Sequence, residues 1–200
     1  MTGRSYGGVS AAERVSTRRS SLLESCRTVI GREGVAAATV EAVCAESALG
    51  KRYFYESFTT RDEMLLAVAD AFYVDLLAQM HAAIVGLPDE DRPRPVVETL
   101  VAALSGDQRL ARLYVESPAT PVLAERRHRA IDDYTRFVAD AVLPARATDE
   151  RSRARQRLAT RLLVAGTTDL VAGWLAGEVS GDADDIIEAI AAVGAGLAGA

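Results

Sequence analysis

A cluster of cationic and aromatic side chains between residues 51 and 58 is the part of this sequence best suited to chemistry. It begins with Lys51, the only lysine among the 200 residues, and continues with Arg52, Tyr53 and Tyr55. Cations can hydrogen-bond guanine edges or neutralise phosphates, and tyrosine hydroxyls can bind phosphate. On a short helix, such side chains could enter the major groove of DNA. The same side chains would also suit a merely solvated, amphipathic helix surface.

Two short helices joined by a tight turn must position this cluster. Thr39 offers an N-cap hydroxyl for the first helix, and Ser47 and Ala48 form the turn after it. The second helix is predicted over residues 51–57, with Gly50 as its weaker N-cap. Its two phenylalanines lie four residues apart on one face, which must point to the core and leaves the cations and Tyr55 to reach outward.

The flanking segments complete a three-helix unit. Apolar residues recur at helical spacing over residues 17–32, and Gly34 follows as a C-terminal stop. Thr60 and Glu63 have the spacing of a capping box, which predicts that the next helix opens there.

The distribution of charge agrees with a DNA contact at this end of the chain only. The net charge is −5, yet residues 1–32 hold six arginines against two acidic residues. Residues 65–200 hold 14 arginines against 20 acidic residues. Any attraction for phosphate therefore belongs to the N-terminal third.

Residues 18–66 resemble the DNA-binding domain of the tetracycline-repressor (TetR) family of bacterial transcription regulators. The resemblance rests on Thr39-Val40, Val43-Cys44, Ser47-Ala48-Leu49-Gly50, Phe54-Tyr55, Phe58 and Arg61-Asp62-Glu63-Met64-Leu65. Four residues depart from the family pattern: Ala48 in place of the turn glycine, Gly50 in place of the serine cap, the bulky Tyr53, and Glu56. Glu56 could accept a bond from cytosine N4, pair with Arg52 or repel phosphate. The candidate DNA-binding residues are Arg18, Thr39, Gly50, Lys51, Arg52, Tyr53, Tyr55 and Arg61.

The expected fold is all-α, with about nine helices. A three-helix helix-turn-helix head at residues 16–63 would precede a larger C-terminal domain at 64–200 for ligand binding and dimerisation. A long helix over residues 60–85 would join them, and further helices are predicted at 95–105, 107–117, 119–143, 150–178 and 182–198, with breaks at Ser105-Gly106, Pro118, Pro144 and Ser180-Gly181. The last two helices have surplus apolar surface, and the resemblance implies a four-helix homodimer interface; completing the monomer core is the other interpretation.

Large or polar side chains within aliphatic stretches are candidates to line an effector pocket: Tyr73, Met80, Tyr114, Tyr134, Phe137, Thr168 and Trp174. Each could equally be plain core. Asp169 lies in an apolar stretch, where a buried carboxylate needs a partner, either Arg161 or an arginine across the dimer. The other interpretation is that Asp169 anchors a ligand. The segment Arg126, Arg127, His128 and Arg129 is expected to form a solvated helix face.

An enzyme finds little support in this sequence. Its two histidines have no metal-binding spacing, and neither a nucleophile elbow nor a phosphate-binding glycine loop is present, so neither a cofactor nor a metal is expected. Cys26 and Cys44 are expected to be reduced core residues. With no apolar signal segment, we expect a cytoplasmic homodimer that binds operator DNA and a small-molecule effector, not a membrane. The alternative is a helical, dimeric ligand-binding protein whose head no longer binds DNA.

Overall fold

The computed structural model describes residues 10–143 and 149–198. Over that part of the chain it contains nine α-helices and no strand, which confirms the expected all-α class. The helices are α1 (Ala11–Glu33), α2 (Val40–Ser47), α3 (Lys51–Ser57), α4 (Arg61–Ala83), α5 (Pro93–Ser105), α6 (Gln108–Glu116), α7 (Pro121–Phe137), α8 (Glu150–Leu175) and α9 (Ala183–Ala198). Short 3-10 turns occupy Asp89–Asp91 and Ser117–Ala119, and a π-helical turn, Val138–Val142, follows α7.

Helix α1 begins six residues earlier than the apolar periodicity predicts. Its N-cap is Ser10, whose hydroxyl accepts from the amide of Glu13 at 3.1 Å while the Glu13 carboxylate accepts from the Ser10 amide at 2.6 Å. This reciprocal capping box satisfies two amides that an isolated first turn would leave without partners. The helix stops at Gly34, which has a positive φ of 95°.

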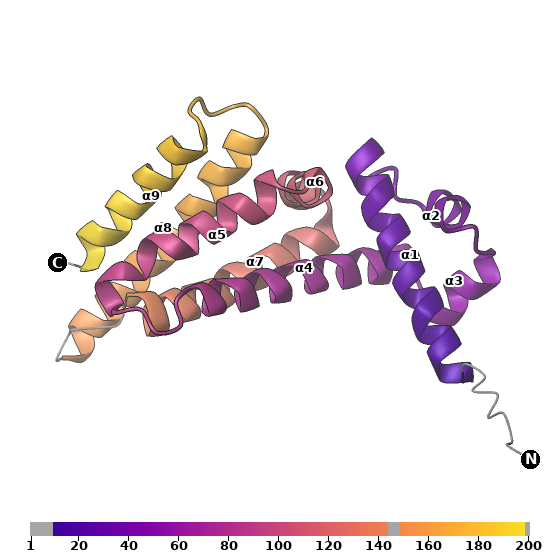
Figure 1. The fold of residues 1–200 in the computed structure, drawn as a ribbon, viewed down its shortest axis with the longest axis horizontal. Helices are drawn as coiled ribbons and strands as arrows, with labels where there is room; N and C mark the ends of the chain where they lie inside the picture. Colours follow the sequence, from indigo (N-terminus) through magenta and orange to yellow (C-terminus); the bar gives the residue numbers. More distant parts are fainter. Residues whose placement is uncertain (1–9, 144–148, 199–200) are drawn as a thin grey trace, which may run out of the picture.

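Helices α1, α2 and α3 form a compact head around a small apolar core (Figure 1). Phe54 and Phe58 are 0% and 1% exposed, as their spacing predicts, and Leu22 of α1 and Val43 of α2 are buried with them. The turn between α2 and α3 passes through Ala48 in the left-handed conformation, with φ 54° and ψ 27°. A Cβ there costs about 1 kcal/mol, so the turn accepts strain that a glycine would avoid.

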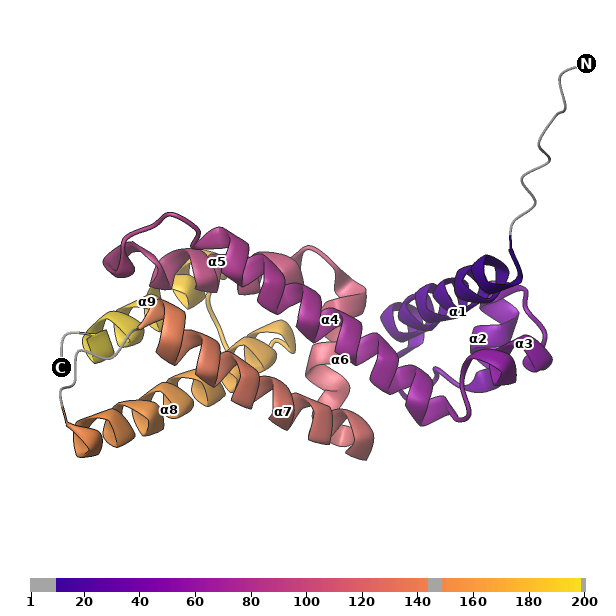
Figure 2. The same ribbon diagram turned by 90° about the horizontal axis from the view of Figure 1, so that it is seen from below.

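Helix α4 runs along the body and joins it to the head (Figures 1 and 2). Thr60 caps it, as predicted, but the Glu63 carboxylate accepts from the amide of Thr59 instead of Thr60. The helix is long and apolar enough to cross a membrane by length and composition alone. Here it packs against α1, α5 and α7, and its apolar residues lie in both the head core and the body core.

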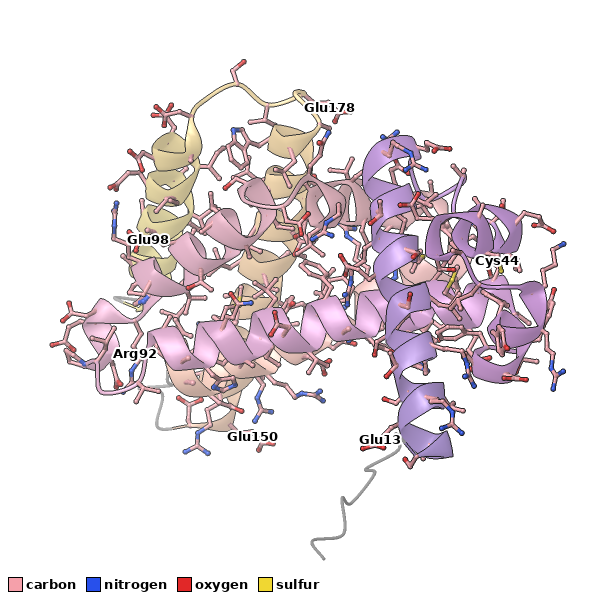
Figure 3. The ribbon with its side chains drawn as sticks, turned by 45° about the vertical axis from the view of Figure 1, so that its right-hand side comes forward. Glu13, Cys44, Arg92, Glu98, Glu150 and Glu178 are labelled. Carbon is pink, nitrogen blue, oxygen red and sulfur yellow. The ribbon has the colours of Figure 1, made fainter. Side chains whose placement is uncertain are left out.

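The body contains α5 to α9 and lies at the opposite end of the molecule from α2 and α3 (Figure 2). Breaks occur near Gly106, Pro118 and Gly181 as predicted, while Pro144 lies outside the described residues. Helix α5 starts at Pro93, two residues earlier than expected, because proline suits the first turn of a helix. The side chain of Arg92 lies at the end of the body farthest from the head (Figure 3) and donates to the carbonyl of Ala141 at 3.0 Å.

The expectation of a solvated face over residues 126–129 is wrong for its first member. Arg126 is only 6% exposed, forms an ion pair with Asp70 of α4, and lies over the ring of Tyr73 at 4.9 Å. Asp70 is 56 positions away in the sequence, so no local pattern on α7 could reveal it.

Both cysteines are buried and free, as expected. Cys44 lies on α2 within the head (Figure 3), and Cys26 lies on α1. Burial raises the pKa of the Cys26 thiol to about 12, although Arg61 and Arg27 act weakly in the opposite direction. The thiol of Cys26 is therefore protonated, and poorly nucleophilic, at neutral pH.

Candidate nucleic-acid interface and ligand cavity

Helix α3 exposes the cationic and aromatic cluster at the tip of the head. Phe54 and Phe58 fix the rotation of the helix because they fill the core, and the remaining positions must then face outward. Tyr53 is 40% exposed and Tyr55 is 58% exposed. Lys51 and Arg52 are exposed as well, so the described part of the chain presents both cations and both tyrosines to solvent.

Each cation of this surface is already paired with a carboxylate of the head. Lys51 binds Glu41 of α2, which raises the pKa of the ammonium and lowers that of the carboxyl. Glu56 pairs with Arg52 at 3.1 Å and with Arg18 of α1 at 3.5 Å. Incoming phosphates must therefore compete with two glutamates, and Glu41 is a member that the sequence analysis missed.

Arg18 of α1 also stacks on the exposed side of α3. Its guanidinium lies 4.7 Å from the centre of the Tyr53 ring, and the two side chains fix one another. Tyr55 makes an edge contact with Phe54, with ring centres 5.3 Å apart. The contact with Arg18 of α1 therefore gives the bulky Tyr53 side chain on α3 a defined orientation.

Two of the expected contact residues are helix N-caps. The Thr39 hydroxyl caps α2 and accepts from the amide of Ala42 at 3.1 Å. Gly50 caps α3 without any side-chain bond, and no protein atom lies within 4 Å of the place where its Cβ would be. The surface around Gly50 is therefore open to close approach.

Arg61, a candidate DNA contact, bonds to main-chain carbonyls within the head. Its Nε donates to the carbonyl of Ala38 at 2.9 Å, and one terminal nitrogen donates to the carbonyl of Val35 at 2.6 Å. The side chain is 30% exposed. These two hydrogen bonds hold the segment between α1 and α2 in place.

The body contains a cavity of about 70 Å³ between α4, α5, α7, α8 and α9. Five of the seven predicted pocket residues line it: Met80, Tyr114, Tyr134, Phe137 and Thr168. Tyr73 lies behind this wall, where its carbonyl accepts from the Tyr134 hydroxyl at 3.3 Å. Trp174 lies elsewhere, and its indole donates to the carbonyl of Gly181 at 3.0 Å, which ties α8 to the loop before α9.

The expected burial of Asp169 and its pairing with Arg161 are wrong, while an arginine partner across the dimer stays a prediction. Asp169 is exposed, so burial does not require a partner for it, and Arg161 pairs with Asp132 of α7 instead. Asp169 lines a separate polar depression together with Arg127 and Glu178. The apolar sequence around Asp169 belongs to the other faces of α8.

Helix α6 connects the cavity wall to the head through a joint that the sequence did not reveal. One oxygen of Glu116 accepts from the amide of Val35 at 2.6 Å, and the other accepts from Arg112 at 2.8 Å. Arg112 also donates to the carbonyl of Arg32 at 3.1 Å, at the end of α1. On the same helix, the Tyr114 hydroxyl in the cavity wall donates to the carbonyl of Thr168 at 3.3 Å.

An apolar groove lies on the outside of the body between α8 and α9. Its most exposed members are Leu162 at 76% and Val193 at 57%. Leu163, Thr167 and Ile190 line both this groove and the cavity, so a single layer of side chains separates the two spaces.

Comparison with known proteins agrees with this architecture. Residues 22–68, which include most of α1, all of α2 and α3 and the start of α4, match the family model for bacterial regulatory proteins of the tetR family. No curated protein matches the sequence at a significant level.

Several solved structures share the whole fold. The fatty acid degradation regulator FadR from Bacillus halodurans superposes with a TM-score of 0.72 at 14% identity, over 90% of this chain and 95% of that chain. The multidrug binding protein EbrR, solved in complex with imidazole, gives a TM-score of 0.67 at 19% identity over 96% and 97%. A transcriptional regulator from Rhodococcus sp. Rha1 gives 0.66 at 19% identity over 90% and 94%.

Proposed function

We propose that this protein, a member of the tetR family of bacterial regulatory proteins, is a ligand-responsive transcriptional repressor. It would bind a palindromic operator as a homodimer in the cytoplasm and leave the operator when a small molecule binds the body. The observation that carries this proposal is the position of Lys51, Arg52, Tyr53 and Tyr55. They lie on the exposed side of α3, at the tip of a head whose residues match the family model.

In this proposal α3 is the recognition helix. Lys51 and Arg52 bind phosphates or guanine edges after exchanging Glu41 and Glu56 for DNA. Tyr53, Tyr55 and Arg18 contact the backbone beside the groove, and the open surface at Gly50 and the start of α2 at Thr39 lie against phosphate. Arg61 is excluded from the interface because its guanidinium is bound to two carbonyls inside the head.

The head at residues 16–63 would act twice in a homodimer formed by the body at 64–200. The exposed apolar groove between α8 and α9 supports this arrangement, because apolar side chains that lie together on the surface, such as Leu162 and Val193, are typical of an interface. A two-fold axis there would present two recognition helices, so the half-site spacing must match the separation of the heads.

The effector would occupy the apolar cavity and act on the head through two routes. Helix α4 joins both parts directly, and α6 links the cavity residue Tyr114 to the Glu116–Arg112 contacts at the end of α1. A ligand that favours a different position of either helix changes the separation of the heads. Linkage then requires that the ligand bind the free dimer more tightly than the operator-bound dimer.

One observation keeps a second function open. Lys51, Arg52 and Arg18 all have carboxylate partners within the head. The same ion pairs would balance these cations in a head that never binds phosphate. The alternative is therefore a dimeric, helical ligand-binding protein whose head no longer binds DNA.

Fluorescence anisotropy on the DNA upstream of the protein's own gene discriminates between the two. We expect saturable binding that weakens with added salt and that is lost when Lys51, Arg52 and Tyr55 are changed together to alanine. Binding without salt dependence, or binding that the triple variant retains, refutes the proposal. Circular dichroism of the variant serves as the folding control, because all three side chains are exposed and none belongs to the core.

A further inference from the structure

The cavity in the body has walls that carry no charge. Its described lining consists of aliphatic and aromatic side chains, a few small residues and hydroxyl groups, without any Asp, Glu, Lys, Arg or His. An ionised group in such a space would lose its hydration and find no counter-ion, which is strongly unfavourable. The walls therefore select against charged molecules.

Four hydroxyl groups line the cavity, on Tyr114, Tyr134, Thr167 and Thr168, and three of them restrict the ligand further. Tyr114 and Tyr134 donate to the carbonyls of Thr168 and Tyr73, both at 3.3 Å, and Thr168 donates to the carbonyl of Val164 at 2.7 Å. Burial raises the pKa of both tyrosines, so they remain neutral phenols. With their protons already bound to the main chain, these three oxygens can offer a ligand only lone pairs. A ligand group that donates a hydrogen bond suits them better than one that only accepts.

The size of the space sets a third limit. A water molecule needs roughly 10–15 Å³ of such volume, so about 70 Å³ has room for a molecule several times the size of water. That corresponds to a single ring or a short branched chain. Helix α9 provides Ile190, Ala191 and Gly194 to the cavity wall, and larger residues at the last two positions would fill the space.

We infer that the cavity binds an uncharged, mainly hydrocarbon molecule of about one ring in size that carries one hydrogen-bond donor, such as an alkylphenol. The inference rests on the proposed function only in taking this cavity as the effector site. It names the chemical class of the ligand, and binding can be measured without DNA.

Four probes of nearly equal shape test the inference on the full-length protein by isothermal titration calorimetry. They are 4-ethylphenol, 4-ethylanisole, 4-ethylbenzoate and 4-ethylbenzylamine, which present a donor, an acceptor only, an anion and a cation. We expect 4-ethylphenol to bind most tightly, 4-ethylanisole at least about fivefold more weakly, and no binding of either ion at the same concentrations. Equal or tighter binding of the benzoate or the benzylamine overturns the inference, as does the absence of binding by all four.

Two variants locate the binding. Ala191→Phe fills the cavity and should abolish phenol binding, whereas Ala102→Phe makes the same change at an exposed site on α5 and should not. If Ala191→Phe lowers the melting temperature sharply, Tyr134→Phe replaces it, and the phenol should then lose its advantage over the anisole. Unchanged phenol binding by Ala191→Phe, or a phenol advantage over the anisole that Tyr134→Phe leaves intact, overturns the inference. Binding as expected with unchanged operator affinity would instead refute the proposed release mechanism and leave the ligand class standing.

Discussion

Replacing Arg61 by alanine separates a structural role from a DNA contact. The guanidinium donates to the carbonyls of Val35 and Ala38 at 2.6 and 2.9 Å, and both of these residues are at most 1% exposed. Hydrogen bonds to charged groups contribute about 1.5–3 kcal/mol each. Because the Arg61 side chain is 30% exposed, we take values at the low end and expect a total loss of about 2–4 kcal/mol.

This loss should be visible in unfolding experiments. For a chain of this length, 1 kcal/mol corresponds to about 2–4 °C in melting temperature, so Arg61→Ala should lower it by about 5–15 °C at a fixed protein concentration. Arg61→Lys can reach only one of the two carbonyls with its single nitrogen and should lie between the variant and the parent. Urea denaturation at constant protein concentration gives the corresponding free energies.

DNA binding measured where every variant is folded completes the test. Arg61→Ala should retain operator affinity within about threefold and keep the same salt dependence, since its guanidinium faces the interior of the head. Arg52→Ala, whose side chain is 87% exposed, should show the opposite pattern of unchanged stability and weaker binding. An Arg61→Ala protein with parental stability but a reduced salt dependence would show that Arg61 contacts phosphate and that our assignment is wrong.

Three further predictions concern the exposed side of α3, the contact of α6 with the end of α1, and the core of the head. Lys51→Ala should reduce the slope of log Kobs against log salt by about 1.8 for the dimer, because each of the two heads loses one phosphate contact and each contact contributes about 0.9. Glu41→Gln should tighten binding, whereas Glu178→Gln in the body should not. An unchanged slope for Lys51→Ala would exclude Lys51 from the interface. Glu116→Ala removes the acceptor of the Val35 amide. A ligand commonly changes affinity by about 5- to 150-fold in allosteric proteins, and in a filter-binding assay this variant should make the ligand-induced loss of operator affinity at least about fivefold smaller. Unaltered release would mean that α4 alone transmits the signal. The native Cys26 thiol should resist Ellman's reagent at pH 8 and react only on unfolding. Because its pKa is about 12 when folded and 9.0 ordinarily, it should make stability decrease as the pH rises from about 9 towards 12, and thermal melts of a Cys26→Ala variant should show a smaller decrease, to which the buried tyrosines still contribute.

The sequence predicted the head well because its signals are local. Thr39 and Gly50 cap helices at the expected residues, and Phe54 and Phe58 fix which side of α3 faces outward. The start of α1 was missed because its first turn is polar, and only the Ser10 capping box marks it. Sequence periodicity detects an apolar face and not a solvated first turn.

The partners of charged residues could not be predicted because they depend on how helices cross. Glu41 and Lys51 are ten residues apart and meet only through the angle of the turn at Ala48. Asp70 and Arg126 are 56 residues apart, and their pairing buries an arginine that local sequence assigns to solvent. The apolar sequence around Asp169 misled in the opposite direction, because α8 buries only one face and Asp169 lies on an exposed one.

The wall that the cavity shares with the groove between α8 and α9 would give the proposed dimer a concentration-dependent sensitivity. Leu163, Thr167 and Ile190 line both spaces, so they would lie between a ligand on one side and a second subunit on the other. In the proposed dimer, whatever repacks these side chains for one partner changes the affinity for the other by the same factor. The ligand dose that a bacterium needs for induction would then depend on how many copies of the protein it holds.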